Sequence, residues 1–230
     1  MIFFLIKKKN IYVILFFFIL LYLFVISGNK IVYFTSIIVI YFYYAGKNFS
    51  EKIGLFFILT LVVFSIFPII DSQLFKTPIL TGTFVNRMFF IPAVLTNFYF
   101  ELFDGSPLLF AETHFFNLFV KSPYDMPIAF YISKIYWNGS DAYNNNGIVS
   151  DGFMNLGYFG VLLFSIIFTL LFSFFNSLNL HKGYFGLFFC YIFILLSAPL
   201  MTCLITGGLI LFSLIALVVL KEKTPQLNNQ

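Results

Sequence analysis

The sequence has very few charged residues for its length. Only 10% of its 230 residues are Asp, Glu, Lys or Arg, whereas a water-soluble domain usually carries about 25%. Hydrophobic residues make up 61%, and they include 37 Phe and 14 Tyr. A water-soluble fold of this length cannot bury so many aromatic side chains. The composition therefore predicts an all-α polytopic membrane protein.

Motifs for nucleotide, metal or nucleic-acid binding are also missing. The sequence has no glycine-rich phosphate loop, no G-x-S-x-G and no C-x-x-C. Its histidines and carboxylates do not follow a metal-ligand spacing, and its lysines gather at the ends of apolar runs. We therefore expect no cofactor, no bound metal and no nucleic-acid partner. Cys190 and Cys203 lie within apolar runs, where thiols are expected to be buried as small hydrophobic side chains.

Six apolar runs approach the length of a membrane span. A bilayer core about 30 Å thick requires roughly 20 apolar residues in a helix, and the backbone in lipid must satisfy its own hydrogen bonds. No small-residue cleavage site follows the first run, so we interpret it as a transmembrane helix. No charge pair lies inside the runs, which disfavours an ion-coupled transporter. The expected spans are Ile11–Ile26, Ile31–Ala45, Ile53–Ile70, Phe153–Phe175, Tyr184–Leu200, and a last one from Met201 or Cys203 to Leu220.

The positions of the lysines orient these helices. If the N-terminus is cytoplasmic, eight lysines lie in cytoplasmic segments and only Lys30 lies in a short external link. Both termini are then cytoplasmic, and the loop between the third and fourth spans lies on the outer side of the membrane. The expected segments are three transmembrane helices (1–70), a long external loop (71–151), three further transmembrane helices (152–223) and a disordered tail (224–230).

The external loop is itself only partly polar. Phe84–Phe103 is apolar enough to suggest a seventh span, but it contains Arg87, Pro92 and Glu101. We interpret it as an interfacial or re-entrant helix. Two further stretches are rich in aromatic residues that suit the headgroup boundary, and they are expected to form short amphipathic helices resting on the membrane: Leu108–Val120 and Met126–Trp137.

The same loop concentrates the polar chemistry of the chain. It contains the only arginine, Arg87, and seven of the nine acidic residues. A guanidinium at the head of an apolar stretch either clamps an anion, such as a lipid-linked pyrophosphate, or anchors the chain at the interface. A carboxylate or imidazole near an outer-leaflet substrate can serve as a general base toward a sugar hydroxyl, although acidic residues in such a loop are also commonly just solvated. The candidates are Glu101, Asp104 and His114.

Two features at the end of the loop suggest structural roles. Asp151 precedes the fourth apolar run, and Asp is favoured as the N-cap of a helix. Gly157 and Gly160 are small enough to let another helix or a substrate approach closely, or they are simply packing glycines. The stretch between Asn138 and Gly147 is rich in turn-forming residues.

Several stretches of the loop resemble one family of membrane enzymes. They are NRMFFIP (86–92), NFYFELF (97–103), NNNGI (144–148) and DGFMNLGYFG (151–160). Together with the long external loop and its flanking helices, they resemble the bacterial O-antigen polymerases, which are the Wzy-type polymerases of oligosaccharide repeat units. The resemblance covers residues 84–161, and the family is very divergent.

The resemblance implies an enzyme that acts at the periplasmic face of the inner membrane. Such enzymes transfer a growing glycan from undecaprenyl pyrophosphate to an incoming lipid-linked repeat unit, alongside a chain-length regulator and a flippase. It implies that Arg87 holds the anionic donor. We also expect Tyr99, Trp137, Asn146 and Asp151 to contact the substrate. This chain is shorter than typical family members and has one external arginine instead of several. The alternatives are an O-antigen ligase, another membrane glycan transferase, or a non-enzymatic transporter or scaffold subunit.

Overall fold

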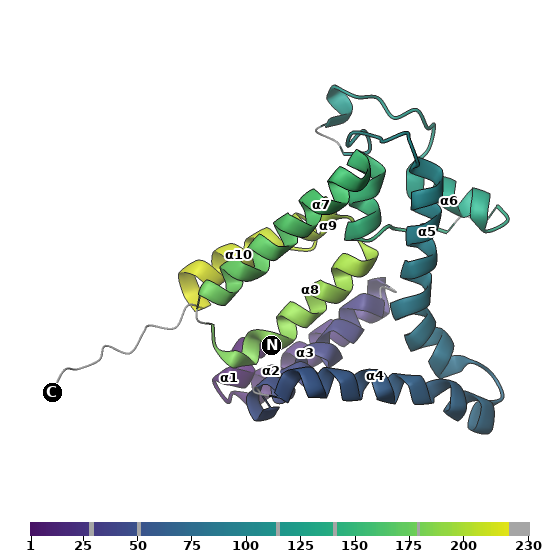
Figure 1. Cartoon of the computed structure of the whole chain (residues 1–230). Helices are drawn as coiled ribbons and strands as arrows, with labels where there is room; N and C mark the ends of the chain where they lie inside the picture. Colours follow the sequence, from purple (N-terminus) through teal and green to yellow (C-terminus); the bar gives the residue numbers. More distant parts are fainter. Residues whose placement is uncertain (28–29, 50–51, 114–115, 140–141, 179, 221–230) are drawn as a thin grey trace. The chain divides into compact units, whose positions relative to one another are not determined.

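The computed structural model describes residues 1–27, 30–49, 52–113, 116–139, 142–178 and 180–220. Within these ranges every regular element is a helix, as Figure 1 shows, which confirms the all-helical class. The chain divides into two compact units. The first contains Met1–Val63, Leu178–Ile192 and Leu214–Gln230, and the second contains Phe64–Ser177 and Phe193–Ser213. The expected tail, 224–230, lies outside the described residues.

The first unit is formed by the N-terminal helices and by two segments that return to them. Its elements are α1 (Ile2–Ile6), α2 (Asn10–Ser27), α3 (Lys30–Phe49), the beginning of α4 (Ile53–Ile70), η5 (Lys182–Tyr184), the beginning of α8 (Phe185–Ser197) and η6 (Ala216–Leu220). Gly186 lies where α8 meets α3, and a Cβ there would lie 2.6 Å from the carbonyl oxygen of Val39. The absence of a side chain therefore lets the two helices pack in direct backbone contact.

The second unit contains the polar loop and the helices around it. Its elements are the end of α4, η2 (Asp71–Phe75), η3 (Thr81–Phe90), α5 (Ile91–Phe103), η4 (Phe116–Leu118), α6 (Ile128–Tyr136), α7 (Ile148–Ser177), the end of α8, α9 (Leu200–Leu204) and most of α10 (Leu209–Ile215). The π-helix η3 runs into α5 without a break, because the residues that join them are helical. Helix α5 packs against α7, and both contribute to one buried core of Leu95, Tyr99, Phe103, Leu108, Ile128, Ile132, Phe153 and Met154.

Helix α7 is sharply bent near its beginning. Gly157 has φ 62° and ψ −149°, a conformation that only glycine adopts readily. The residues before it therefore fold back onto the residues after it. Gly152 and Gly160 meet at this fold, since a Cβ on Gly152 would lie 2.7 Å from the carbonyl oxygen of Gly160. The close approach expected at Gly160 is thus made within one helix, by its own first turns.

Three helical stretches are long and apolar enough to cross a membrane. They are Ile58–Phe75, Ile148–Ser177 and Leu200–Leu220. Four shorter apolar helices, each below 18 residues, cover Asn10–Leu23, Ser36–Gly46, Ile91–Phe103 and Gly186–Ser197. The protein therefore has the character of a membrane protein, while the count of six spans, the external loop and the orientation stay predictions. Helix α4 has the expected bounds, but Pro68 lies inside it and the chain remains helical to Phe75.

One expected helix of the loop is wrong. Leu108–Val120 forms turns and, over its described residues, a single 3₁₀ turn in place of an amphipathic helix. Leu109 and Phe110 have φ values of 50° and 64°, which no α-helix contains. Their amide groups bond to α7 instead: Leu109 N donates to the carbonyl oxygen of Asn155, at 3.1 Å. By contrast, the other expected short helix, Met126–Trp137, contains α6.

Candidate functional site

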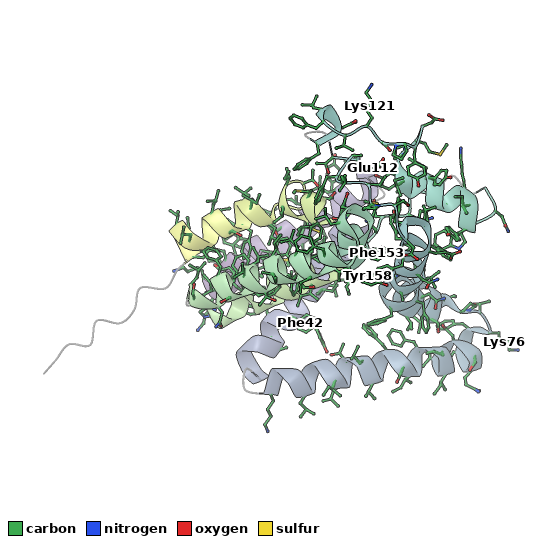
Figure 2. All side chains as sticks on the ribbon, turned by 45° about the horizontal axis from the view of Figure 1, so that its top comes forward. Phe42, Lys76, Glu112, Lys121, Phe153 and Tyr158 are labelled. Carbon is green, nitrogen blue, oxygen red and sulfur yellow. The ribbon has the colours of Figure 1, made fainter. Side chains whose placement is uncertain are left out.

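The candidate site is the junction between α5, the segment 142–147 and the first turns of α7. The rings of Phe100 and Phe153 stack here, with centroids 3.9 Å apart. The hydroxyl of Tyr99 donates to the carbonyl oxygen of Asn144, at 3.1 Å. Figure 2 shows Phe153 and Tyr158 close together at the bend of α7, where their rings meet edge to face at 5.1 Å. Aromatic stacking and the hydrogen bond of the Tyr99 phenol therefore join α5 to the segment around Asn144 and to the first turns of α7.

Burial keeps the phenol of Tyr99 in its neutral form. Its side chain is only 2% exposed. Burial, and after it the electrostatic influence of Tyr143, Asp151 and Glu112, raises the pKa of Tyr99. The hydroxyl thus keeps its proton and remains a hydrogen-bond donor to the backbone of Asn144.

The carboxylate of Asp151 joins distant parts of the second unit. It is 5% exposed. One oxygen, Oδ2, accepts from Leu200 N at 2.8 Å, and the other, Oδ1, accepts from Asn155 Nδ2 at 2.9 Å. Asn155 in turn accepts from Phe110 N through Oδ1, at 2.8 Å. The pair Asp151 and Asn155 therefore connects the start of α9, the first turns of α7 and the loop after α5.

The role expected for Asp151 needs a correction. It is not the N-cap of its own helix, because α7 begins at Ile148. Ser150 Oγ exchanges hydrogen bonds with the backbone of Gly147, at 3.1 Å, and so serves the local start. The Asp151 carboxylate instead caps α9, whose first residue is Leu200. It is a cap, as predicted, but for a helix that begins forty-nine residues later.

Asn146 lies beside this carboxylate without completing a hydrogen bond to it. Its side chain is 3% exposed. Its amide nitrogen lies near the Asp151 carboxylate but has no hydrogen-bond partner in the described part of the chain. Asn146, Asp151 and Tyr99 are thus brought together and buried. Their side chains hold the junction, and their contact with a substrate stays a prediction.

Arg87 lies on η3, whose start is fixed by a second buried carboxylate. Asp71 is 3% exposed. Its Oδ1 accepts from Leu80 N at 2.9 Å, and its Oδ2 accepts from Thr81 N at 2.6 Å. The π-helix is rare and occurs frequently at functional sites, and here it carries the only arginine. The Arg87 side chain itself lies outside what the structure describes.

The other predicted site residues are not gathered at the junction. Glu101 and Asp104 are exposed at the end of α5, and the backbone of His114 lies outside the described residues. Trp137 follows α6 and meets the ring of Phe98 edge to face, at 5.9 Å. Of these residues, only Glu101 and Asp104 are described as open to solvent, and they lie three residues apart.

Sequence reasoning missed Glu112, which acts in the same way as Asp71 and Asp151. Its Oε2 accepts from Ile128 N at 3.1 Å, at the start of α6. In all three cases a carboxylate caps a helix that begins just after a proline: Pro78, Pro127 or Pro199. Proline has no N–H group, so the first donors of such a helix come after it. A proline just before a helix is therefore the sequence signal for these caps. The sequence does not show which carboxylate caps which helix.

Comparison of the chain with protein-family models, with curated proteins and with solved structures gives no match. Among the described residues, no group of three His, Cys, Asp or Glu side chains is placed to hold a metal ion. Cys190 and Cys203 are buried and form no disulfide. The sequence resemblance and the local geometry of the second unit therefore provide the only indications of function.

Proposed function

We propose that the chain polymerises lipid-linked oligosaccharide repeat units, of O-antigen or another surface polysaccharide, at the periplasmic face of the inner membrane. In this reaction a hydroxyl of the incoming repeat unit attacks the anomeric carbon of the growing glycan. The bond from that carbon to undecaprenyl pyrophosphate breaks, the pyrophosphate leaves with its lipid, and a base takes the hydroxyl proton. No nucleotide sugar is consumed.

The observation that carries this proposal is the meeting of the stretches that resemble the polymerase family. The stretch 97–103 supplies Tyr99 and Phe100 on α5, and the stretches 144–148 and 151–160 supply Asn144 and Phe153. Residues that are far apart in sequence but belong to one motif set are expected to be neighbours in the folded protein. Their packing supports the interpretation that they form one functional element.

The residues then take distinct roles in the proposal. Arg87, on the helix that continues into α5, holds the departing pyrophosphate through its planar fork of donors. Glu101 and Asp104 are the accessible carboxylates for the proton transfer. Asp71 and Asp151 are excluded from that transfer in this conformation because both are buried and accept backbone hydrogen bonds.

Arg87→Ala is expected to stop chain extension while the protein still reaches the membrane. A strain that lacks the gene should display surface polysaccharide with one repeat unit, and wild-type protein should restore the ladder of longer chains on a glycan gel. Arg87→Lys keeps the charge but loses the fork, so we expect short chains. Lys76→Ala is the matched control, because Lys76 is an exposed cation in the same unit.

The same strains separate the competing functions. A full ladder with Arg87→Ala, at normal protein level, would rule out the anion clamp. Long polymer that stays on its lipid carrier in the deletion strain would indicate a ligase. Unchanged surface glycan in the deletion strain, with co-purification of a larger membrane partner, would indicate a transporter or scaffold subunit.

A further inference from the structure

The loop after α5 exposes a short apolar tip, residues 116–121. Leu118 is 79% exposed and Phe119 is 75% exposed. These values match those of apolar side chains in the candidate span α7, where Tyr158 is 75% and Leu170 is 64% exposed. The tip therefore has the surface of a membrane-facing segment, although it is not a span.

A chain of aromatic contacts ties this tip to α7. The ring of Phe116 packs on Phe110, with centroids 5.3 Å apart, and Phe110 packs on Phe164, with centroids 6.2 Å apart. Phe164 is a buried residue of the candidate span. The apolar tip thus begins beside the membrane-crossing part of α7, whose exposed side chains include Leu162 and Ile166.

Several backbone N–H groups of the tip already have hydrogen-bond acceptors, which makes an apolar environment less costly for the tip. Phe119 N and Val120 N both donate to the carbonyl oxygen of Phe116, at 2.9 Å, and Asn117 N donates to Thr113 O at the same distance. Unsatisfied backbone groups make insertion into lipid costly, and these three donors are satisfied within the turn. A tip with open amide groups would be held out in water.

The charge at the edge of the tip suits a lipid headgroup. Lys121 is exposed and follows the apolar residues directly, and Figure 2 shows it pointing outward from the loop. The nearest described carboxylate before the tip, Glu112, bonds to Ile128 N and Ser122 Oγ. An apolar tip bordered by a cation is typical of segments that lie in the interface of membranes with anionic lipids.

We propose that residues 116–121 form a membrane anchor, in which Leu118 and Phe119 enter the interfacial layer beside α7 while Lys121 meets the phosphate groups of anionic lipids. The anchor holds the loop after α5 against the bilayer. Since the loop is also bonded to Asn155 through Phe110 N, the anchor positions the junction next to the membrane surface. This inference does not depend on the proposed function.

A single-tryptophan variant tests the anchor in the full chain. Trp137 is the only tryptophan, so Phe119→Trp combined with Trp137→Phe places one reporter in the tip. The protein is reconstituted in vesicles of phosphatidylcholine with phosphatidylglycerol, with or without brominated acyl chains. We expect blue-shifted emission and quenching by the brominated lipid. The matched control is Asp125→Trp with Trp137→Phe, at an exposed acidic position of the same loop.

The outcomes decide both parts of the proposal. Emission from Phe119→Trp that is as red-shifted and as weakly quenched as that of the Asp125→Trp control would overturn the anchor. Adding Lys121→Gln should reduce the quenching in vesicles that contain phosphatidylglycerol and leave it unchanged in pure phosphatidylcholine. Equal quenching with and without Lys121→Gln in both vesicles would overturn the role of Lys121.

Discussion

Replacing Asp151 by Ala is expected to destabilise the second unit severely. The change leaves Leu200 N buried without its acceptor, and an unsatisfied buried group costs about 1–3 kcal/mol. Asn155 Nδ2 loses one of its two acceptors and keeps its bond to the backbone oxygen of residue 151. It also uncaps α9, which is only five residues long. We expect a large loss of folded protein in the membrane and a clearly lower melting temperature in detergent. Fluorescence of Trp137 provides the measurement, because this residue packs on Phe98 in the same unit.

A double exchange distinguishes a structural role from a chemical one. In Asp151→Asn alone, the side-chain oxygen of residue 151 is needed by Leu200 N, and the side-chain oxygen of Asn155 is needed by Phe110 N. The two side-chain NH2 groups therefore face each other without an acceptor between them. Combining D151N with N155D restores an oxygen for Leu200 N, an oxygen for Phe110 N and a donor–acceptor pair between the two side chains. It loses the bond from Asn155 Nδ2 to the backbone oxygen of Asp151. We therefore expect the double variant to be clearly more stable than either single variant.

The control for this cycle is Asp125→Ala, which removes an exposed carboxylate from the same unit. Surface substitutions of this kind usually change stability by less than about 0.5 kcal/mol. A melting temperature of Asp151→Ala equal to that of the control would contradict the cap. If the single variants were stable but had no polymerase activity, the result would indicate that Asp151 acts in the reaction and is not needed for folding.

The apolar runs predicted the helices, because a backbone surrounded by lipid or apolar side chains can only bond to itself. The runs Ile53–Ile70 and Phe153–Phe175 coincide with α4 and with the central part of α7. The break at Gly157 could not be predicted, since a glycine in an apolar run is compatible with a straight helix. Likewise, the aromatic content of Leu108–Val120 suggested a helix, whereas the bonds from Leu109 and Phe110 to Asn155 impose turns.

Three of the residues that the sequence suggests for the site lie together at the junction, but their hydrogen-bond partners could not be predicted, and their contact with a substrate stays a prediction. Tyr99, Asn146 and Asp151 were selected from the sequence, and they lie together. Nothing in the sequence shows that the acceptor for Leu200 N is forty-nine residues earlier, because such long-range partners depend on how the helices pack. For the same reason the sequence is compatible with Asp71 and Glu112 as solvated acids and with Asp151 as the cap of its own helix, whereas each one caps a helix further along the chain.

Whether replacing Gly160 by Ala raises or lowers the stability of the protein is a second strong test of the fold at the bend of α7. Gly160→Ala would bring a Cβ into contact with the carbonyl oxygen of Gly152 and to 2.9 Å from Leu156 Cβ. Helix propensity alone favours Ala over Gly by about 1 kcal/mol. The contact is with backbone, which cannot move aside as a flexible side chain can, so overpacking at a typical cost of about 1–3 kcal/mol prevails. We expect a lower melting temperature, measured again by Trp137 fluorescence.

Gly82→Ala is the matched control, and it should change stability little or raise it slightly. Gly82 is a helical residue of the same unit, and a Cβ there would meet no atom within 4 Å. Gly152→Ala should resemble Gly160→Ala, because its Cβ would face the Gly160 carbonyl oxygen at 2.7 Å. If Gly160→Ala and Gly152→Ala both melted at the same temperature as Gly82→Ala, the first turns of α7 would not be folded back. Without that fold, the Asp151 carboxylate would not be placed to accept from Leu200 N. We therefore expect the Asp151→Ala and Gly160→Ala experiments to agree, with both variants destabilised or neither.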